Sequence, residues 1–144
     1  EAICFPASEA GTRESFAARL KVFPRHFLLL EDEGRLIGFV NGMVTDDRTI
    51  SDVMFEQAEL HKEDGKWQSV FGLDVLPETG KGYAGQLMRA LIEHSREDGR
   101  CGCILTCKEH LLPYYTRFGF RNLGVSLSQH GGAVWYDMIL EFSR

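Results

Sequence analysis

The chain has 144 residues, of which 44% are hydrophobic and 26% charged, and its formal net charge is −5 at pH 7. This is the composition of one soluble globular domain, long enough to bury a full core, so residues 1–144 are expected to form a single domain. The negative balance argues against nucleic-acid binding, which needs a basic face, and it suits cationic ligands such as amines. No apolar run approaches the ~18 residues of a membrane span and no signal peptide is visible, so we expect no membrane partner and a cytoplasmic protein.

The first half of the chain predicts a helix, a strand hairpin and a second, short helix. Apolar residues of segment 9–22 recur at helical spacing, and Pro24 ends this helix because proline has no N–H to donate. Asp32-Glu33-Gly34 has the composition of a hairpin turn between two strands. We expect helices at residues 9–22 and 51–60, strands at 26–31 and 35–44, the end of an earlier helix at 1–5, and a charged loop at 61–66.

The second half predicts four strands separated by two helices, which indicates a mixed α/β sheet. Segment 67–76 is an apolar strand that Pro77 ends, and segment 84–98 is an amphipathic helix that stops at Gly99. Regular alternation along the first strand would place four side chains on one face: Ser69, Phe71, Leu73 and Val75. We expect strands at 67–76, 103–107, 120–128 and 133–142, and helices at 84–98 and 109–118.

A glycine-rich turn, residues 80–85, joins the first of these strands to its helix. The first N–H groups of a helix have no internal partner and carry partial positive charge, so such a turn can aim them at an anion. Gly80, Gly82 and Gly85 remove side chains that would block close approach, and Lys81 adds a cation. The residues therefore predict a cradle for a phosphate or a pyrophosphate.

The glycine-rich turn has three possible interpretations: a P-loop, a dinucleotide-binding turn, or a surface loop without a ligand. A P-loop would follow its lysine with Ser or Thr, whereas Lys81 is followed by Gly82. Gly80-x-Gly82-x-x-Gly85 has the spacing of the dinucleotide fingerprint, but the next strand brings no acid before Glu109. In a chain with 15 glycines this spacing also arises by chance, so a surface loop without a ligand stays open as the alternative.

Two motifs in this order resemble those of the GNAT superfamily of N-acetyltransferases. Val75-x-Pro77 followed by Gly80-Lys81-Gly82-Tyr83-Ala84 resembles its motif A, which holds the pyrophosphate of acetyl-CoA. Tyr115-Thr116-Arg117-Phe118-Gly119-Phe120 resembles its Tyr-x-x-x-Gly-Phe signature. The resemblance covers nearly the whole chain and is closer still to the aralkylamine (serotonin) N-acetyltransferase branch. Residues similar to that branch are Pro24, Glu56, Leu60, His61, Gly65, Cys107, Leu111, Pro113 and the segment 115–120.

The resemblance implies an α/β GNAT (acyl-CoA N-acyltransferase) fold. This is a mixed central sheet with splayed parallel strands, flanked by helices, and its first strand would precede Glu1 and be missing here. It also implies acetyl-CoA as co-substrate, with the pyrophosphate on the glycine turn and the pantetheine arm along the strand before it. The cofactor-binding residues that it implies are Leu73, Asp74, Val75, Gly80, Lys81, Gly82, Tyr83, Ala84 and Gly85. Asp74 alternates away from the active-site face and is not assigned as a base.

The implied chemistry is direct transfer of the acetyl group to a primary amine. The backbone N–H near Leu73 would polarise the thioester oxygen, and Tyr115 would protonate the thiolate leaving group. A primary amine is mostly protonated at pH 7, so a base is needed. We expect a water chain past Ser69 with Glu56 as that base. Other residues expected at the pocket rim are Glu59 and His61.

Phe23, Pro24 and Phe71 are expected to contact the acceptor, which favours a small amine with a hydrophobic or aryl group. Two alternatives stay open. A non-catalytic acyl-CoA-binding module would keep the glycine turn and lose transfer, and an acetyltransferase of protein or peptide amines would need an open acidic groove. The sequence does not indicate an oligomeric state.

The chain departs from the family pattern in two places. Only two residues separate Pro77 from Gly80, one fewer than usual, and Thr79 stands where Arg or Gln is usual. The phosphate contacts at this point are therefore open. Vertebrate members of the branch carry a His-x-His pair as a proton path, whereas Ser69 and Phe71 occupy those positions here.

Cysteine and histidine spacing predicts no metal site. Cys101 and Cys103 lie too close together for the usual zinc spacing, and Cys4 and Cys107 supply no second pair. Reduced, mostly buried thiols are the expectation. The histidines are scattered along the chain, and His94 is interpreted as a packed helix residue rather than a ligand.

Overall fold

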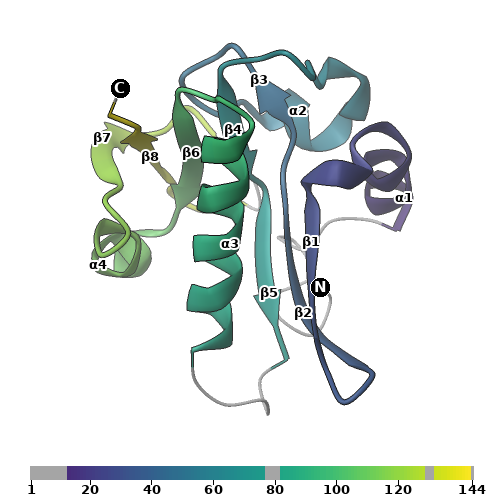
Figure 1. Cartoon of the computed structure of the whole chain (residues 1–144). Coiled ribbons are helices and arrows are strands. Elements are labelled where there is room, and N and C mark those ends of the chain that lie inside the picture. Colours follow the sequence, from purple (N-terminus) through teal and green to yellow (C-terminus); the bar gives the residue numbers. More distant parts are fainter. Residues whose placement is uncertain (1–12, 77–81, 129–131, 144) are drawn as a thin grey trace.

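The computed structural model describes residues 13–76, 82–128 and 132–143 (Figure 1). The helices are α1 (Arg13–Val22), α2 (Asp52–Glu56), α3 (Tyr83–Glu97) and α4 (Leu112–Thr116), with short 3-10 helices η1 (Pro24–His26), η2 (Ala58–Leu60) and η4 (Glu109–Leu111). The strands are β1 (Phe27–Asp32), β2 (Arg35–Asn41), β3 (Val44–Thr45), β4 (Trp67–Val70), β5 (Gly72–Val75), β6 (Gly102–Cys107), β7 (Arg121–Val125) and β8 (Tyr136–Glu141). The helix end expected at residues 1–5 and the strand expected before Glu1 lie outside the described residues.

The mixed α/β architecture and the order of elements are confirmed. The hairpin turn is tight because Glu33 and Gly34 both have positive φ, 52° and 78°. The helix predicted at 51–60 is divided at Gln57, whose φ of −120° and ψ of 86° are not helical, into α2 and η2. The last two strands are shorter than predicted.

The strand predicted ahead of the glycine turn is wrong as a single strand, because it is two, β4 and β5, separated at Phe71. The Phe71 N–H bonds to the Asn41 carbonyl at 2.7 Å, one residue out of the register in which Asn41 pairs with Gly72. An extra residue of this kind turns the following side chains to the other face. Phe71 therefore packs on one core cluster while Leu73 and Val75 pack on the other, so the single face predicted for them does not exist.

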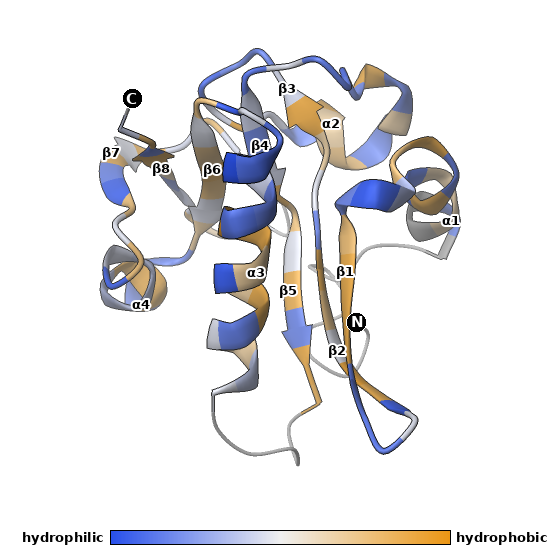
Figure 2. Ribbon diagram, in the orientation of Figure 1, coloured by the Kyte–Doolittle hydropathy of each residue, from blue (hydrophilic) through white to orange (hydrophobic). Residues whose placement is uncertain are grey.

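The strands form two sheets. One has the order β1-β2-β5 and is antiparallel, and the other has the order β3-β4-β6-β8-β7 with β4 and β6 as its parallel pair. The chain passes from β5 through α3 to β6. The hydrophobic side of α3 faces β5 in Figure 2, and its hydrophilic side faces outward.

β6 separates the two core clusters. Its residues Cys103, Leu105 and Cys107 pack with Leu87 and Leu91 of α3, whereas the residue between them, Ile104, packs with the other cluster. That alternation places the clusters on opposite faces of the strand. The members of the second cluster include Phe23, Met43, Met54, Trp67 and Ile139.

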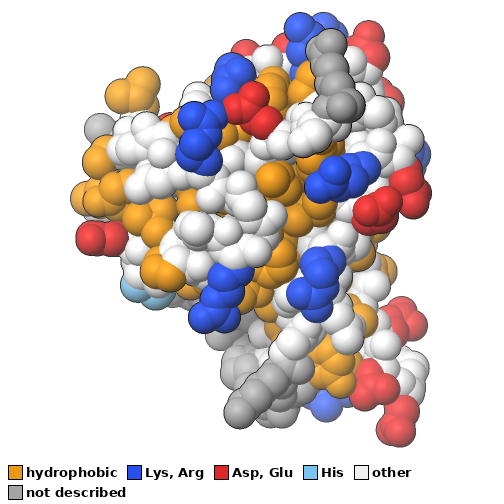
Figure 3. Space-filling view, turned by 60° about the vertical axis from the view of Figure 1, so that its left-hand side comes forward, with side chains coloured by type: hydrophobic (Ala, Val, Ile, Leu, Met, Phe, Trp, Pro, Cys, Tyr) orange, Lys and Arg blue, Asp and Glu red, His pale blue; other side chains and the backbone are white. Residues whose placement is uncertain are grey.

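Two surface properties bear on partners. None of the described helices is both long enough and apolar enough to cross a membrane. On the side of the molecule turned forward in Figure 3, which carries β7 and α4 in Figure 1, basic side chains stand among hydrophobic ones.

Candidate active site

β4 and β6 run side by side and then part. Parallel pairing joins Trp67 to Gly102 and continues as far as Val70 and Leu105. Beyond that point β5 pairs with β2, while β6 continues beside β8 to Cys107. In the view of Figure 1, β5 and β6 appear on either side of α3. The facing edges of β5 and β6 therefore do not pair with each other and can bind a ligand.

The backbone of β5 presents two residues to this opening. In an antiparallel ladder, residues that bond to the partner strand alternate with residues that face away from it. The Leu76 N–H bonds to the Ile37 carbonyl at 2.9 Å. The backbone N–H and C=O of Asp74, two residues earlier, therefore also face β2. The peptide groups of Leu73 and Val75 consequently face the edge turned toward β6, where the sequence analysis placed the pantetheine arm and the thioester oxygen.

α3 begins at a glycine with left-handed backbone. Gly82 has a φ of 90°, and the first helical hydrogen bond runs from the Gln86 N–H to the Gly82 carbonyl at 3.0 Å. Within the described residues no side chain caps this end and no acid lies in its first turn. The amides of Tyr83, Ala84 and Gly85 therefore have no intrahelical partner. The other predicted residues of the turn, Gly80 and Lys81, lie outside the described residues.

An arginine that the sequence analysis did not single out lies over this helix end. A Cβ built on Gly85 would meet the guanidinium nitrogens of Arg89 at 3.3 and 3.4 Å. Side chains of a helix point back toward its N-terminus, which explains how a residue four positions later reaches the first turn. Burial raises the pKa of Tyr114, and the charges of Arg89 and Arg117 oppose this rise. Arg89 and Arg117 therefore both act electrostatically on Tyr114.

The predicted acid, Tyr115, lies in α4 and packs against the core cluster that includes Leu87 and Leu91 of α3. Its ring meets those of Tyr114 and Phe120 edge-on, with centroids 5.2 and 6.2 Å away. Burial raises the pKa of the Tyr115 phenol, and Cys107, Tyr114 and Asp74 raise it further. The phenol therefore carries a proton to donate at neutral pH, and its raised pKa makes it a weaker acid than an exposed tyrosine.

The two residues predicted to remove the proton of the amine lie in different surroundings. Ser69 is fully buried on β4, and its hydroxyl donates to the Met43 carbonyl at 2.7 Å. Glu56 is exposed at the end of α2. No hydrogen bond connects the two side chains in the part of the chain that is described, so the water relay between them stays a prediction.

The predicted acceptor wall is built from α1, α2 and Phe71. The Phe71 ring lies 4.6 Å from that of Phe55 and 6.4 Å from that of Phe23, measured between centroids. The Arg19 guanidinium lies 5.0 Å from the Phe71 ring and donates to the Phe55 carbonyl at 3.1 Å. Phe23 is only 1% exposed and supports the wall from behind, whereas Pro24 is exposed. The sequence analysis missed Arg19 and Phe55, because only the fold brings them to Phe71.

Three comparisons relate this arrangement to known proteins. Residues 2–120 match the model of the Acetyltransferase (GNAT) family. The chain is 30% identical over 125 residues to the serotonin N-acetyltransferase of Mesocricetus auratus, a match that covers 79% of this chain and 58% of that protein. The chain therefore spans little more than half the length of this relative.

Solved structures share the fold at low sequence identity. The loading GNATL domain of CurA from Lyngbya majuscula superposes with a TM-score of 0.81 at 13% identity, covering 98% of this chain and 88% of that one. The GphF GNAT-like decarboxylase in complex with isobutyryl-CoA superposes with a TM-score of 0.76 at 17% identity, covering 98% and 90%. The GNAT fold predicted from the two sequence motifs is confirmed.

Proposed function

Because the chain belongs to the Acetyltransferase (GNAT) family, we propose that it is an acetyl-CoA-dependent N-acetyltransferase. The acetyl group passes directly to the primary amine of a small, aralkyl or hydrophobic acceptor. The observation that carries this proposal is the combination of a parted parallel strand pair with an uncapped helix end. Binding of an acyl-CoA by a protein of this fold is supported by the isobutyryl-CoA complex of the GNAT-like decarboxylase.

The diphosphate of CoA binds at the N-terminus of α3. There the amides of Tyr83, Ala84 and Gly85 supply donors, and the helix dipole supplies partial positive charge. Arg89, together with Lys81 of the turn, supplies full positive charge. A helix end with amide donors and a flexible arginine is a suitable partner for a diphosphate, because charge-assisted hydrogen bonds are about twice as strong as neutral ones.

Transfer takes place between β5 and β6. The amine nitrogen attacks the thioester carbon, and the peptide N–H of Leu73 stabilises the oxygen as it becomes negative. The carbon–sulfur bond then breaks, and the CoA thiolate takes the proton of Tyr115. The proton that the amine loses leaves by the water relay past Ser69 to Glu56, and the phenolate of Tyr115 is reprotonated from solvent. The products are an N-acetyl amine and free CoA.

Phe71 and the aromatic rings around it favour an acceptor with an apolar or aryl group. This acceptor class agrees with the activity in the name of the Mesocricetus auratus relative, serotonin N-acetyltransferase. Two other functions use the same CoA site: an acyl-CoA-binding module without transfer, and acetylation of protein or peptide amines. Each predicts a different substrate profile.

A thiol-release assay with acetyl-CoA and a panel of amines tests the proposal. The panel contains tryptamine and phenethylamine, short aliphatic amines, and peptides with free N-termini or lysines. Release that is fastest with the aryl amines supports the proposed class. Calorimetric binding of acetyl-CoA without release on any amine would leave a binding module, and release on peptides alone would identify a protein acetyltransferase.

A further inference from the structure

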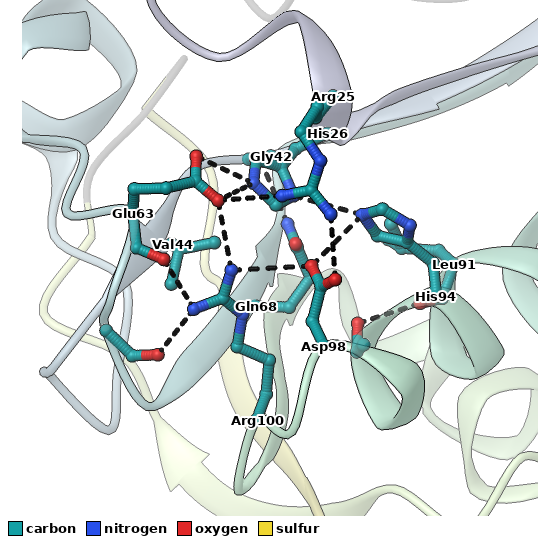
Figure 4. A network of polar contacts seen from close by, with 12 residues as sticks. Arg25, His26, Gly42, Val44, Glu63, Gln68, Leu91, His94, Asp98 and Arg100 are labelled. Atoms are coloured by element: carbon teal, nitrogen blue, oxygen red, sulfur yellow. Dashed lines mark hydrogen bonds and ion pairs between the residues drawn. The ribbon is translucent and has the colours of Figure 1, made fainter.

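A polar network away from the CoA site joins the segment after α1, the loop before β4 and the end of α3 (Figure 4). Its two carboxylates, Glu63 and Asp98, are bridged by Arg25, which contacts them at 2.9 and 2.7 Å. His26 lies at the centre of the network and is completely buried. Its Nε2 lies 3.1 Å from Glu63 Oε2, and its Nδ1 lies 3.3 Å from Nε2 of His94.

Three atoms of this network that can bind a metal ion lie close together. Nε2 of His94 lies 3.3 Å from Nδ1 of His26 and 3.4 Å from Oδ2 of Asp98, and all three atoms lie within 4.8 Å of one another. Hydrogen bonds from N–H groups favour about 2.9–3.0 Å, so these contacts are long. Tetrahedral ligands about 2.0–2.1 Å from a zinc ion lie roughly 3.3–3.4 Å from one another. The distances from His94 Nε2 to the other two atoms are therefore those expected between zinc ligands.

We propose that His26 Nδ1, His94 Nε2 and Asp98 Oδ2 bind a Zn²⁺ ion, with water as the fourth ligand. Two histidines and one carboxylate are a ligand set that zinc accepts. Outer partners are in place, because His26 donates its other ring N–H to Glu63 and Arg25 holds the second oxygen of Asp98. The side chains of His94 and Asp98 are 21% and 16% exposed, which gives the ion a route from solvent.

The other histidine–carboxylate group of the network, His26, His61 and Glu63, is excluded by the tautomer of His61. The backbone N–H of Val44 donates to Nδ1 of His61 at 2.9 Å, so this nitrogen carries no proton. A neutral His61 must then carry its proton on Nε2, which lies 2.9 Å from Glu63 Oε1 and donates to it. A ring nitrogen that bears a proton has no lone pair to give a metal.

Binding zinc requires few changes in the hydrogen bonds of the network. His94 moves its proton from Nε2 to Nδ1, so no proton is gained or lost overall. Arg100 gives up its 3.4 Å contact with Asp98 Oδ2 but keeps the carbonyls of Glu63 and Gly65 at 2.6 and 3.0 Å. The charges of Glu63 and Asp98 are already balanced by two arginines, Arg25 and Arg100. The zinc ion therefore adds net positive charge to the network, and we expect moderate rather than picomolar affinity. The ion ties the segment after α1 to the end of α3.

Zinc titration of the full chain, free of any affinity tag and first stripped with chelator, tests the proposal. Calorimetry should show one Zn²⁺ per chain. The Co²⁺-loaded chain should show the intense visible absorption of a tetrahedral site. His94→Gln should weaken zinc binding by more than the 10–100-fold that the loss of an outer partner costs. His94 is only partly buried, and the thermal unfolding of this variant in chelator checks that it folds.

Two histidine variants serve as controls. His110→Gln changes an exposed histidine of η4 outside the network and should bind zinc unchanged. His61→Gln should also keep the tetrahedral cobalt spectrum, because His61 belongs to the excluded group. No zinc binding, equal binding by His94→Gln and the parent chain, or loss of binding in His110→Gln would each overturn the site and leave a hydrogen-bonded ion cluster only.

Discussion

Replacing Gly85 by alanine separates a binding role for this glycine from a structural one. Gly85 lies in the first turn of α3, and glycine in a helix costs up to about 0.5–1 kcal/mol relative to alanine. The described atoms nearest to a Cβ here belong to the Arg89 guanidinium, at 3.3–3.7 Å, and Arg89 is an exposed, flexible side chain that can move aside. We therefore expect Gly85→Ala to unfold about 1–4 °C higher than the parent chain.

The same substitution should weaken CoA binding. The methyl group occupies the approach to the helix amides and displaces the arginine beside them. Losing one charge-assisted hydrogen bond costs about 1.5–3 kcal/mol, which is roughly a ten- to hundredfold rise in Kd for acetyl-CoA. Calorimetry measures this Kd, and thermal unfolding of the same sample measures stability. Glu93→Ala, at an exposed position farther along α3, is the matched control and should leave Kd unchanged. A more stable Gly85→Ala chain with parental affinity would refute the placement of the diphosphate.

Three further outcomes are expected. Tyr115→Phe should lower kcat at least about tenfold with little change in CoA affinity, and unchanged turnover in this variant would remove Tyr115 from the mechanism. Because the pKa of this phenol is raised, its ionisation should not lower the rate of the parent chain between pH 7 and 9. Gly42→Ala should destabilise the fold by about 1–3 kcal/mol or more, since its Cβ would lie 1.9 Å from the Ser69 carbonyl oxygen; parental stability in urea would contradict that contact. Burial raises the pKa of Cys103 to about 12 and of Cys107 to about 11, so mass spectrometry after alkylation at pH 8 should find both unmodified in the folded chain and modified in urea.

The elements that were predicted well are those whose signals are local. The amphipathic period of α3, the glycine at its start and the buried strand that became β6 are each visible in a short segment of the sequence. The break at Phe71 has only one local signal, the isolated Gly72 that follows it, because a glycine inside a strand is typical of a bulge. It is set by the bond from Phe71 to Asn41 of a strand 30 residues earlier, which only the fold provides.

The same limit applies to side-chain clusters. Histidines that look scattered along the chain lie against one another once β1 and α3 pack, with the His26 ring centroid 5.3 Å from those of His61 and His94. Arg19 likewise reaches Phe71 from α1, about 50 residues earlier in the chain. Long polar side chains meet across large sequence separations, and spacing rules for motifs cover only neighbours along the chain.

The position of Arg89 is physically connected to Thr79, the residue by which the turn departs from the family pattern. Family members usually place Arg or Gln before the first glycine of the turn, and this chain has Thr79 there instead. A diphosphate bound at a helix end still needs a counter-charge, because the partial charge of the dipole, about half a unit, does not balance it. Arg89, one turn further along α3, brings a guanidinium to that end, 3.3–3.4 Å from where a Cβ of residue 85 would lie. The Kd of a chain with both Gly85→Ala and Arg89→Gln should therefore rise by no more than the product of the two single rises. If the methyl group of Gly85→Ala acts by displacing Arg89, the rise in Kd of the double variant should be smaller than that product.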